Sequence, residues 1–151
     1  MKKIALVSHC VLNSLCELPE ASDTFRKQIV NLLTDKKISL MQLPCPELCY
    51  QALERESITA EDPKAEKYEQ YCRELLVPVM NNLKEYCRHD IEVAGIIGID
   101  TSPSCSVADG AAIMSKVLLD QMKDAGISCG KLIDMPVEGD GRAFFNQLME
   151  W

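Results

Sequence analysis

Eight cysteines in a chain of 151 residues are the feature of this sequence with the clearest chemical meaning. Cys10 and Cys16 lie six positions apart, Cys45 and Cys49 lie four apart, and the other cysteines stand alone. No pair is spaced as Cys-x-x-Cys, which disfavours a zinc ribbon, a thioredoxin motif and a ferredoxin-type ligand run. The N-terminus also lacks the long apolar core and cleavage site of a signal peptide. We therefore expect metal binding or thiol chemistry rather than a disulfide framework.

Three of these cysteines share one kind of position. Cys10, Cys45 and Cys105 each come shortly after a different apolar run that is typical of a buried strand. In open parallel sheets, ligands bind beyond the carboxyl ends of the strands, near the point where the strand order reverses. The three sulfur atoms are therefore predicted to converge at one edge of a sheet.

The elements that must position these cysteines alternate along the chain. Periodicity, prolines and glycines predict strands and helices in turn. The predicted strands are 3–8, 37–43, 91–99 and 128–137, and the predicted helices are 21–36, 46–54, 63–88, 111–125 and 139–151. Pro78 is expected to kink or split the long helix. This alternation predicts one α/β domain over residues 1–151, a three-layer sandwich with a mostly parallel, Rossmann-like sheet of about four strands.

Two of the three cysteines are also expected to be activated by a helix. Pro46 suits the first position of a helix, so Cys45 is predicted at a helix N-terminus. Exposed N–H groups and the helix dipole lower a thiol pKa there, and the thiolate is the form that binds metals. Cys105, which precedes the helix predicted at 111–125, fits the same pattern more loosely.

Three thiolates without an obvious fourth protein ligand suggest two kinds of centre. One is a four-iron [4Fe-4S] cluster with one iron left open, and the other is a zinc ion completed by water. Disulfide chemistry between Cys45 and Cys49 is a weaker alternative, because that spacing within a helix gives awkward disulfide geometry.

The remaining cysteines have an ordinary structural explanation, since free cysteine is among the most buried residue types. Cys72, Cys87 and Cys129 fall on predicted helices or at the start of a strand, and are expected to be small buried hydrophobes. Cys16 and Cys49 could equally be packing residues or spare thiols near the centre.

Composition and charge exclude several classes of protein. The formal net charge of -7 argues against a nucleic-acid or anionic-membrane surface. No apolar run approaches the ~20 residues that span a bilayer, and we expect a cytoplasmic protein. The chain also has no Gly-x-Gly-x-x-Gly or phosphate-binding loop after its first predicted strand, so a nucleotide cofactor is not expected.

Three motifs together resemble a known family. Residues 8–16 read Ser-His-Cys-Val-Leu-Asn-Ser-Leu-Cys, residues 45–47 read Cys-Pro-Glu, and residues 102–105 read Ser-Pro-Ser-Cys. In this order and at these intervals they resemble the signature of the DUF523 family, whose studied members are the thiouracil desulfidases. The chain is most similar to the branch of desulfidases related to them (TudS-related).

The resemblance implies a function and a site. Cys10, Cys45 and Cys105 would hold a [4Fe-4S] cluster with one open iron, and Glu47 and Ser102 would be the catalytic carboxylate and hydroxyl. The substrate would be a small thiolated heterocycle similar to thiouracil, and the products would be the oxygenated base and hydrogen sulfide.

The residues also allow less specific interpretations. Glu47 could be a glutamate in the first turn of a helix, stabilised by the helix dipole. Ser102 could be a turn hydroxyl before a proline. The alternative function is a non-catalytic protein that binds a cluster or zinc for sulfide carriage or sensing.

Overall fold

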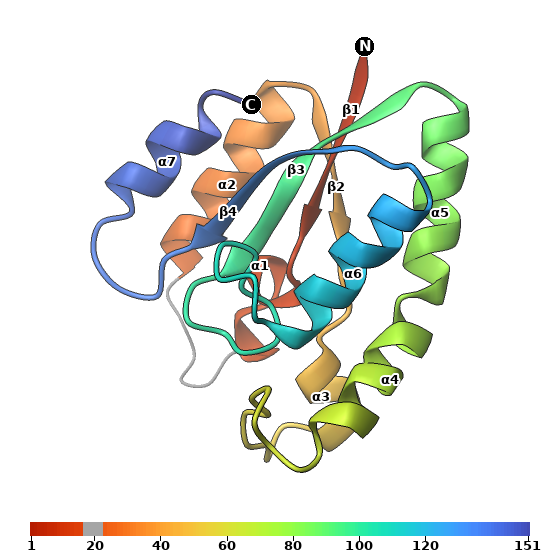
Figure 1. Ribbon diagram of the computed structural model, residues 1–151. Coiled ribbons are helices and arrows are strands. Elements are labelled where there is room, and N and C mark those ends of the chain that lie inside the picture. The colour runs from red at the N-terminus through yellow and green to blue at the C-terminus, as the bar shows by residue number, and fades with distance from the viewer. Residues whose placement is uncertain (17–22) are drawn as a thin grey trace.

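The computed structural model describes residues 1–16 and 23–151. Within them, four strands form one sheet with the order β2-β1-β3-β4, and all three pairings are parallel. The strands are β1 (Lys2–Val7), β2 (Ile38–Gln42), β3 (Ile91–Ile99) and β4 (Cys129–Met135). The prediction of an α/β fold with a parallel sheet of about four strands is therefore confirmed (Figure 1).

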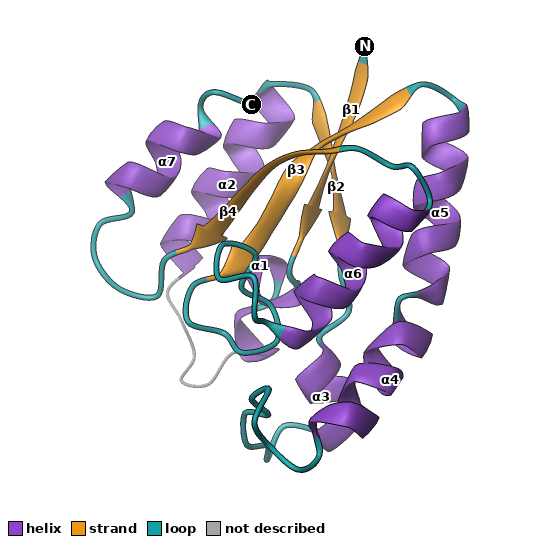
Figure 2. Ribbon diagram, viewed as in Figure 1, coloured by secondary structure: helices purple, strands orange, loops and turns teal. Residues whose placement is uncertain are grey.

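Helices cover both faces of this sheet (Figure 2). The helices are α1 (His9–Leu12), α2 (Asp23–Asp35), α3 (Pro46–Gln51), α4 (Ala65–Leu75), α5 (Val77–Arg88), α6 (Ile113–Asp124) and α7 (Arg142–Leu148). Helices α2 and α7 share one face, where Phe25 and Phe145 make an edge-to-face contact with centroids 5.7 Å apart. Helices α4, α5 and α6 lie on the other face. The result is a three-layer arrangement in which the sheet is buried between helices.

The inner strands show why these sequences form the centre of the sheet. From Val93 to Ile99 every residue of β3 is buried, and Ile4 to Val7 of β1 are buried as well. Strands buried on both faces are typically continuous apolar runs of this kind. The edge strands β2 and β4 are more exposed, and their sequences are accordingly more polar.

The strand order creates a crevice between β1 and β3. The chain leaves β1 through α2 to reach β2 on one side, and leaves β3 through α6 to reach β4 on the other. Because the two connections run over opposite faces, the loops after β1 and β3 separate and leave room beyond the strand ends. At the base of this crevice the chain after β1 is still joined to β3, since the Ser8 N–H donates to the carbonyl oxygen of Ile97 at 2.9 Å.

Several predicted boundaries are confirmed and others are wrong. The break at Leu76 divides the long helix, and Pro78 lies in the first turn of α5, as predicted. Gly126 ends the helix predicted at 111–125 with a left-handed φ of +70°. The last helix is shorter than predicted, because Gly141 adopts φ +73° and α7 begins only after it.

Other differences concern the first helices. The predicted start of the 21–36 helix at residue 21 lies outside the described residues. Residues 9–16, expected as a loop, form the short helix α1 and a 3-10 turn over Ser14–Cys16. Both are too short to show a helical repeat in the sequence. No helix in residues 1–16 and 23–151 is long and apolar enough to cross a membrane.

Candidate functional site

All five residues singled out in the sequence line one cavity at the carboxyl ends of the strands. This cavity of about 190 Å³, called the cysteine cavity below, is lined by Cys10, Cys45, Glu47, Ser102 and Cys105. Its wall is completed by residues from the end of β3 and the loop after it, from the segment after α3 and from the segment after β4, namely Arg55, Ser57, Ile99, Asp100, Thr101, Pro103 and Val137. The predicted convergence of three strand-end cysteines is thus observed.

Cys10 enters the cavity from α1, immediately after β1. The guanidinium Nε of Arg26 donates a hydrogen bond to the Cys10 carbonyl oxygen at 2.8 Å, and Arg26 is buried. Gln42, the last residue of β2, fixes the start of the same helix by donating to the His9 carbonyl oxygen at 2.9 Å. Two contacts from distant elements therefore hold the backbone that presents Cys10.

Cys45 occupies the N-cap of α3, as the sequence predicted. Pro46 is the first residue of the helix, and the Cys45 sulfur accepts a hydrogen bond from the Leu48 N–H at 3.4 Å. This contact uses one of the N–H groups that lack a partner within a helix. The position therefore favours a thiolate at Cys45.

Cys105 lies in the loop between β3 and α6, and hydrogen bonds within that loop fix it. The Ser102 hydroxyl oxygen accepts from the Cys105 N–H at 3.1 Å and from the Ser104 N–H at 3.4 Å. Ser102 thus has the turn role that was one of its two interpretations, and it also lines the cavity.

The next residues of the loop are held by one carboxylate at the end of β4. Asp134 accepts hydrogen bonds from the Ser106 hydroxyl at 2.6 Å, the Val107 N–H at 2.8 Å and the Ala108 N–H at 3.2 Å. Gly98 makes this packing possible, because a Cβ at that position would lie 2.3 Å from the Cys105 carbonyl oxygen. The sequence of β3 and β4 therefore helps to set the position of Cys105.

Among Cys10, Cys16 and Cys45, the thiolate is assigned to Cys45. Cys10 and Cys16 both donate hydrogen bonds to Cys45, and the contact from Cys10 is the largest of the effects that lower the pKa of Cys45 to about 5. The same contact, together with burial, raises the pKa of Cys10 far above its ordinary value. Burial, followed by the hydrogen bond to Cys45, raises the pKa of Cys16 to about 11.

The expectation for Cys105 is wrong. Helix α6 begins at Ile113, too far along the chain to activate this thiol by its N-terminus. Burial instead raises the pKa of Cys105 strongly, and the negative charges of Cys45 and Glu47 act in the same direction. The hydrogen bond with Ser102 lowers the pKa of Cys105 but does not offset these effects.

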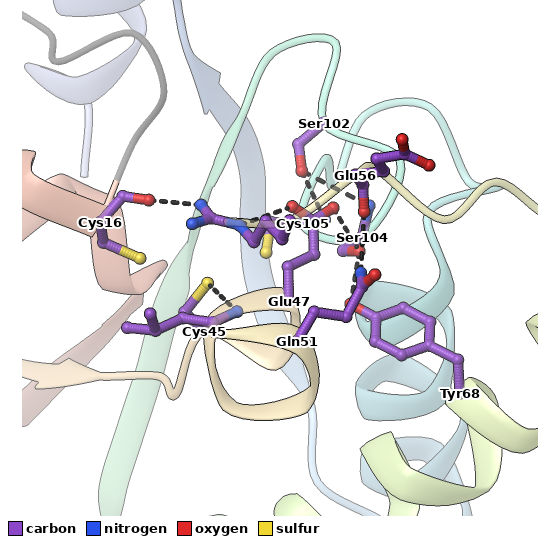
Figure 3. A network of polar contacts seen from close by, with 11 residues as sticks. Cys16, Cys45, Glu47, Gln51, Glu56, Tyr68, Ser102, Ser104 and Cys105 are labelled. Atoms are coloured by element: carbon purple, nitrogen blue, oxygen red, sulfur yellow. Dashed lines mark hydrogen bonds and ion pairs between the residues drawn. The ribbon is translucent and has the colours of Figure 1, made fainter. Parts of the chain in front are cut away.

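Glu47 is the centre of a network that joins three segments (Figure 3). Its Oε1 accepts from the Ser104 hydroxyl at 3.0 Å, and its Oε2 lies 3.3 Å from Nε of Arg55 in an ion pair. The Tyr68 hydroxyl, fully buried on α4, lies 2.7 Å from the Ser104 oxygen. Both partners of Glu47 are donors, so the carboxylate acts as an acceptor here.

Arg55 reaches the cavity because the chain turns back after α3. The helix ends at Gln51, and Ala52 adopts a left-handed φ of +64°. The Gln51 amide then donates to the Glu56 carbonyl oxygen at 2.8 Å, and Ile58 is buried in the core. Arg55 is thereby directed to Glu47, and its Nη2 donates to the Cys16 carbonyl oxygen.

The other five cysteines differ in their burial and in their distance from the site. Cys16 is a buried free thiol that interacts with the thiol of Cys45, so it belongs to the site although it does not line the cavity. Cys49 is exposed on α3. Cys72 is fully buried in the core, as expected, whereas Cys87 and Cys129 pack against the core while partly exposed.

The three cysteines of the cavity, each from a different loop, are its candidate metal ligands. Within residues 1–16 and 23–151, no group of three His, Cys, Asp or Glu side chains is arranged to hold one metal ion. A zinc site needs its sulfurs within ~2.3 Å of one point. Three cysteines around a shared cavity are the residues that could serve as ligands of a multi-iron cluster, whose iron atoms are spread over a larger volume.

Sequence reasoning did not identify Arg55. It lies in a polar segment with no periodicity, and only the turn at Ala52 brings it back to Glu47. Ser104 was visible in the Ser-Pro-Ser-Cys motif, but its link to Glu47 depends on the packing of two distant loops.

The fold and site define a parallel-sheet α/β protein with a cysteine-lined cavity at its strand ends. The chain is 31% identical over 137 residues to "Uncharacterized protein MJ0003" of Methanocaldococcus jannaschii, and the match covers 89% of this chain and 86% of that protein. The chain therefore belongs to the same family as this archaeal protein. No family model and no solved structure matches it.

Proposed function

We propose that the protein is an iron–sulfur-dependent desulfidase of the DUF523 type. It would remove sulfur from a small thiolated heterocycle, such as a thiouracil, and release the oxygenated base and hydrogen sulfide. The observation that carries this proposal is one cavity lined by three cysteines from three strand-end loops together with the partly buried Glu47–Arg55 pair. The likeness of the three motifs to the thiouracil desulfidases supports it.

Cys10, Cys45 and Cys105 are the residues that would hold a [4Fe-4S] cluster and leave one iron without a protein ligand. When bound, such a cluster supplies a Lewis acid for the departing sulfur. The Arg55 guanidinium would offset part of the negative charge that three thiolates bring into a buried site.

Glu47 would act as the general base. The net reaction is a hydrolysis without redox change, in which a water oxygen bonds to the thiocarbonyl carbon and the carbon–sulfur bond breaks. The two protons of the water would pass in turn through Glu47 to the departing sulfur, which leaves as hydrogen sulfide. Ser104 and Arg55 contact different oxygens of the Glu47 carboxylate and hold it at the cavity wall. Ser102 would orient the water or the base from the cavity wall.

The test begins with protein purified or reconstituted without oxygen. We expect about four irons and four acid-labile sulfides per chain, and loss of both when Cys10, Cys45 or Cys105 is replaced by serine. Cys49→Ser is the matched control, because Cys49 is exposed on α3 and outside the cavity. Stoichiometric zinc without iron would contradict the cluster.

Turnover is tested with Glu47→Gln, which keeps the size of the side chain and an acceptor for Ser104. The variant should retain its iron and lose sulfide release from thiolated pyrimidines by ~10²–10⁴-fold. Unchanged release would remove Glu47 from the mechanism.

The alternative, a non-catalytic cluster- or zinc-binding protein for sulfide carriage or sensing, has one observation in its favour. Cys16 places a fourth thiol beside Cys45, and four cysteine ligands would close a cluster to substrate. Stoichiometric sulfide binding without repeated turnover would support this function instead.

We place the protein in the cytoplasm, with small molecules rather than nucleic acid or membrane as partners. All eight cysteines are free thiols, which are typical of a reducing compartment. The net charge of -7 is unfavourable for binding polyanions.

A further inference from the structure

A chain of two buried hydroxyls runs from the protein core to Glu47 (Figure 3). The Tyr68 hydroxyl on α4 lies 2.7 Å from the Ser104 oxygen, and the Ser104 hydroxyl donates to Glu47 Oε1 at 3.0 Å. Tyr68 and Ser104 are fully buried and do not line the cysteine cavity, whereas Glu47 does. Burial raises the pKa of Tyr68 strongly, so its phenol keeps its proton and can act as a hydrogen-bond donor. The chain therefore supports the carboxylate from behind the cavity wall.

The packing of the core does not require these hydroxyls. The ring of Tyr68 packs against Tyr50 with centroids 5.3 Å apart, a contact that a phenylalanine ring would also make. A buried hydrogen-bonded pair can be replaced by apolar groups of the same shape at almost no cost in stability. The two hydroxyls are therefore better explained by the group at the end of the chain, the Glu47 carboxylate.

Glu47 depends on such support because its own helix is short. It lies in the first turn of α3, which has six residues, and several rotatable bonds separate its carboxylate from the backbone. Ser104 contacts Oε1, and Arg55 Nε lies 3.3 Å from Oε2. Contacts to both oxygens determine the direction of the carboxylate. The Tyr68 hydroxyl strengthens the contact at Oε1, because successive hydrogen bonds polarise one another.

We infer that Tyr68 and Ser104 are positioning residues for the reaction at the cysteine cavity. Tyr68 orients the Ser104 hydroxyl, and Ser104 holds the Glu47 carboxylate in the direction in which it meets the attacking water. This inference rests on the proposed function, in which Glu47 is the general base, and adds to it two residues that lie outside the cavity. A misdirected base slows proton transfer and leaves substrate binding intact, so the chain acts on kcat rather than on KM.

The test measures sulfide release from 2-thiouracil by the anaerobic, iron-loaded protein. Tyr68→Phe should lower kcat by ~3–10-fold and Ser104→Ala by ~10–100-fold, with KM unchanged in both. Tyr71→Phe is the matched control. Tyr71 lies on the same helix and also packs against Tyr50, but its hydroxyl has no hydrogen-bond partner among the described residues, so kcat should keep its native value.

The double variant Tyr68→Phe/Ser104→Ala distinguishes positioning from a purely structural role, because it replaces the whole chain by apolar groups. It should unfold at a higher urea concentration than Ser104→Ala, since no hydroxyl is left unpaired, yet its kcat should stay as low. Iron content is measured for each variant, and kcat is expressed per iron-loaded protein. Recovery of kcat together with stability in the double variant would overturn the inference.

A spectroscopic measurement separates this inference from the proposed function. In each background, the infrared difference between the protein and its Glu47→Gln variant isolates the Glu47 carboxylate band, whose frequency responds to the donors on its oxygens. The band should shift in Ser104→Ala and, by less, in Tyr68→Phe, but not in Tyr71→Phe. These shifts without sulfide release from the native protein would support the positioning chain and contradict the desulfidase. Sulfide release with an unmoved band and native kcat would overturn the inference alone, and neither release nor shift would overturn both.

Discussion

Ser104 donates a hydrogen bond to Glu47 Oε1 at 3.0 Å, joining two motifs that lie 57 residues apart in the sequence. Its single proton is committed to the carboxylate, so the Tyr68 hydroxyl, 2.7 Å away, must be the donor to Ser104. The three side chains form a directed chain that ends on Glu47. Both Ser104 and Tyr68 are fully buried, so this chain holds the carboxylate without help from solvent.

Removing Ser104 should cost more stability than removing the hydroxyl of Tyr68. Ser104→Ala leaves the buried Tyr68 hydroxyl unpaired and should lower the free energy of unfolding by ~1–3 kcal/mol. Tyr68→Phe keeps the Ser104–Glu47 bond and should cost ~0.5–1.5 kcal/mol. In the double variant the unpaired hydroxyl is absent, so the losses should be less than additive in urea unfolding. Strict additivity would show that the chain is not coupled.

Cys45 should be the first cysteine alkylated in the metal-free protein. The hydrogen bond from Cys10 lowers the pKa of Cys45 to about 5, so its reactive thiolate is present at about pH 6 and disappears as the pH falls through that pKa. Iodoacetamide labelling, followed by mass spectrometry of the peptides, measures this. Cys10→Ala should move the labelling profile of Cys45 to higher pH.

Cys49 is the internal control for that experiment. It lies one turn further along α3 and its side chain is exposed. Partial desolvation of its thiol, as the larger effect, and the charge of Cys45 nevertheless raise the pKa of that thiol. Labelling of Cys49 before Cys45 at about pH 6 would contradict the assigned thiolate.

Gly98→Ala should damage the cysteine site through the backbone. The new Cβ would lie 2.3 Å from the Cys105 carbonyl oxygen and 2.4 Å from Asp134 Oδ1, so the loop must move. We expect a loss of ~1–3 kcal/mol in the free energy of unfolding and poorer iron retention. Gly110→Ala tests the same loop without a steric clash, since nothing lies within 4 Å of its Cβ. That control carries only the strain of its φ of +73°, and should retain iron.

Asp134→Asn should loosen the loop that carries Cys105. The amide cannot accept all three hydrogen bonds that the carboxylate receives, and the charge that strengthens them is lost. A loss of about 2 kcal/mol is expected in urea unfolding, with weaker retention of iron. Asp140→Asn, at an exposed carboxylate near α7, is the comparison and should have little effect. Equal effects of the two variants would show that Asp134 does not hold the loop.

The sequence by itself predicted the strand-end placement of Cys10, Cys45 and Cys105, and with it the shared cavity. This was possible because continuous apolar runs identify buried parallel strands, and parallel strands end at the same edge of a sheet. The N-cap position of Cys45 was equally predictable, because it depends on Pro46 next to it.

Only the tertiary structure decided the electrostatics and the remaining wall of the site. The raised pKa of Cys105 comes from burial. The lowered pKa of Cys45 depends on hydrogen bonds with Cys10 and Cys16, which belong to a separate segment. Arg55 reaches Glu47 through a left-handed turn at Ala52, which no local pattern in the sequence predicts. Burial and long-range hydrogen bonds depend on which segments pack together, whereas the strand ends follow from local patterns of apolar residues.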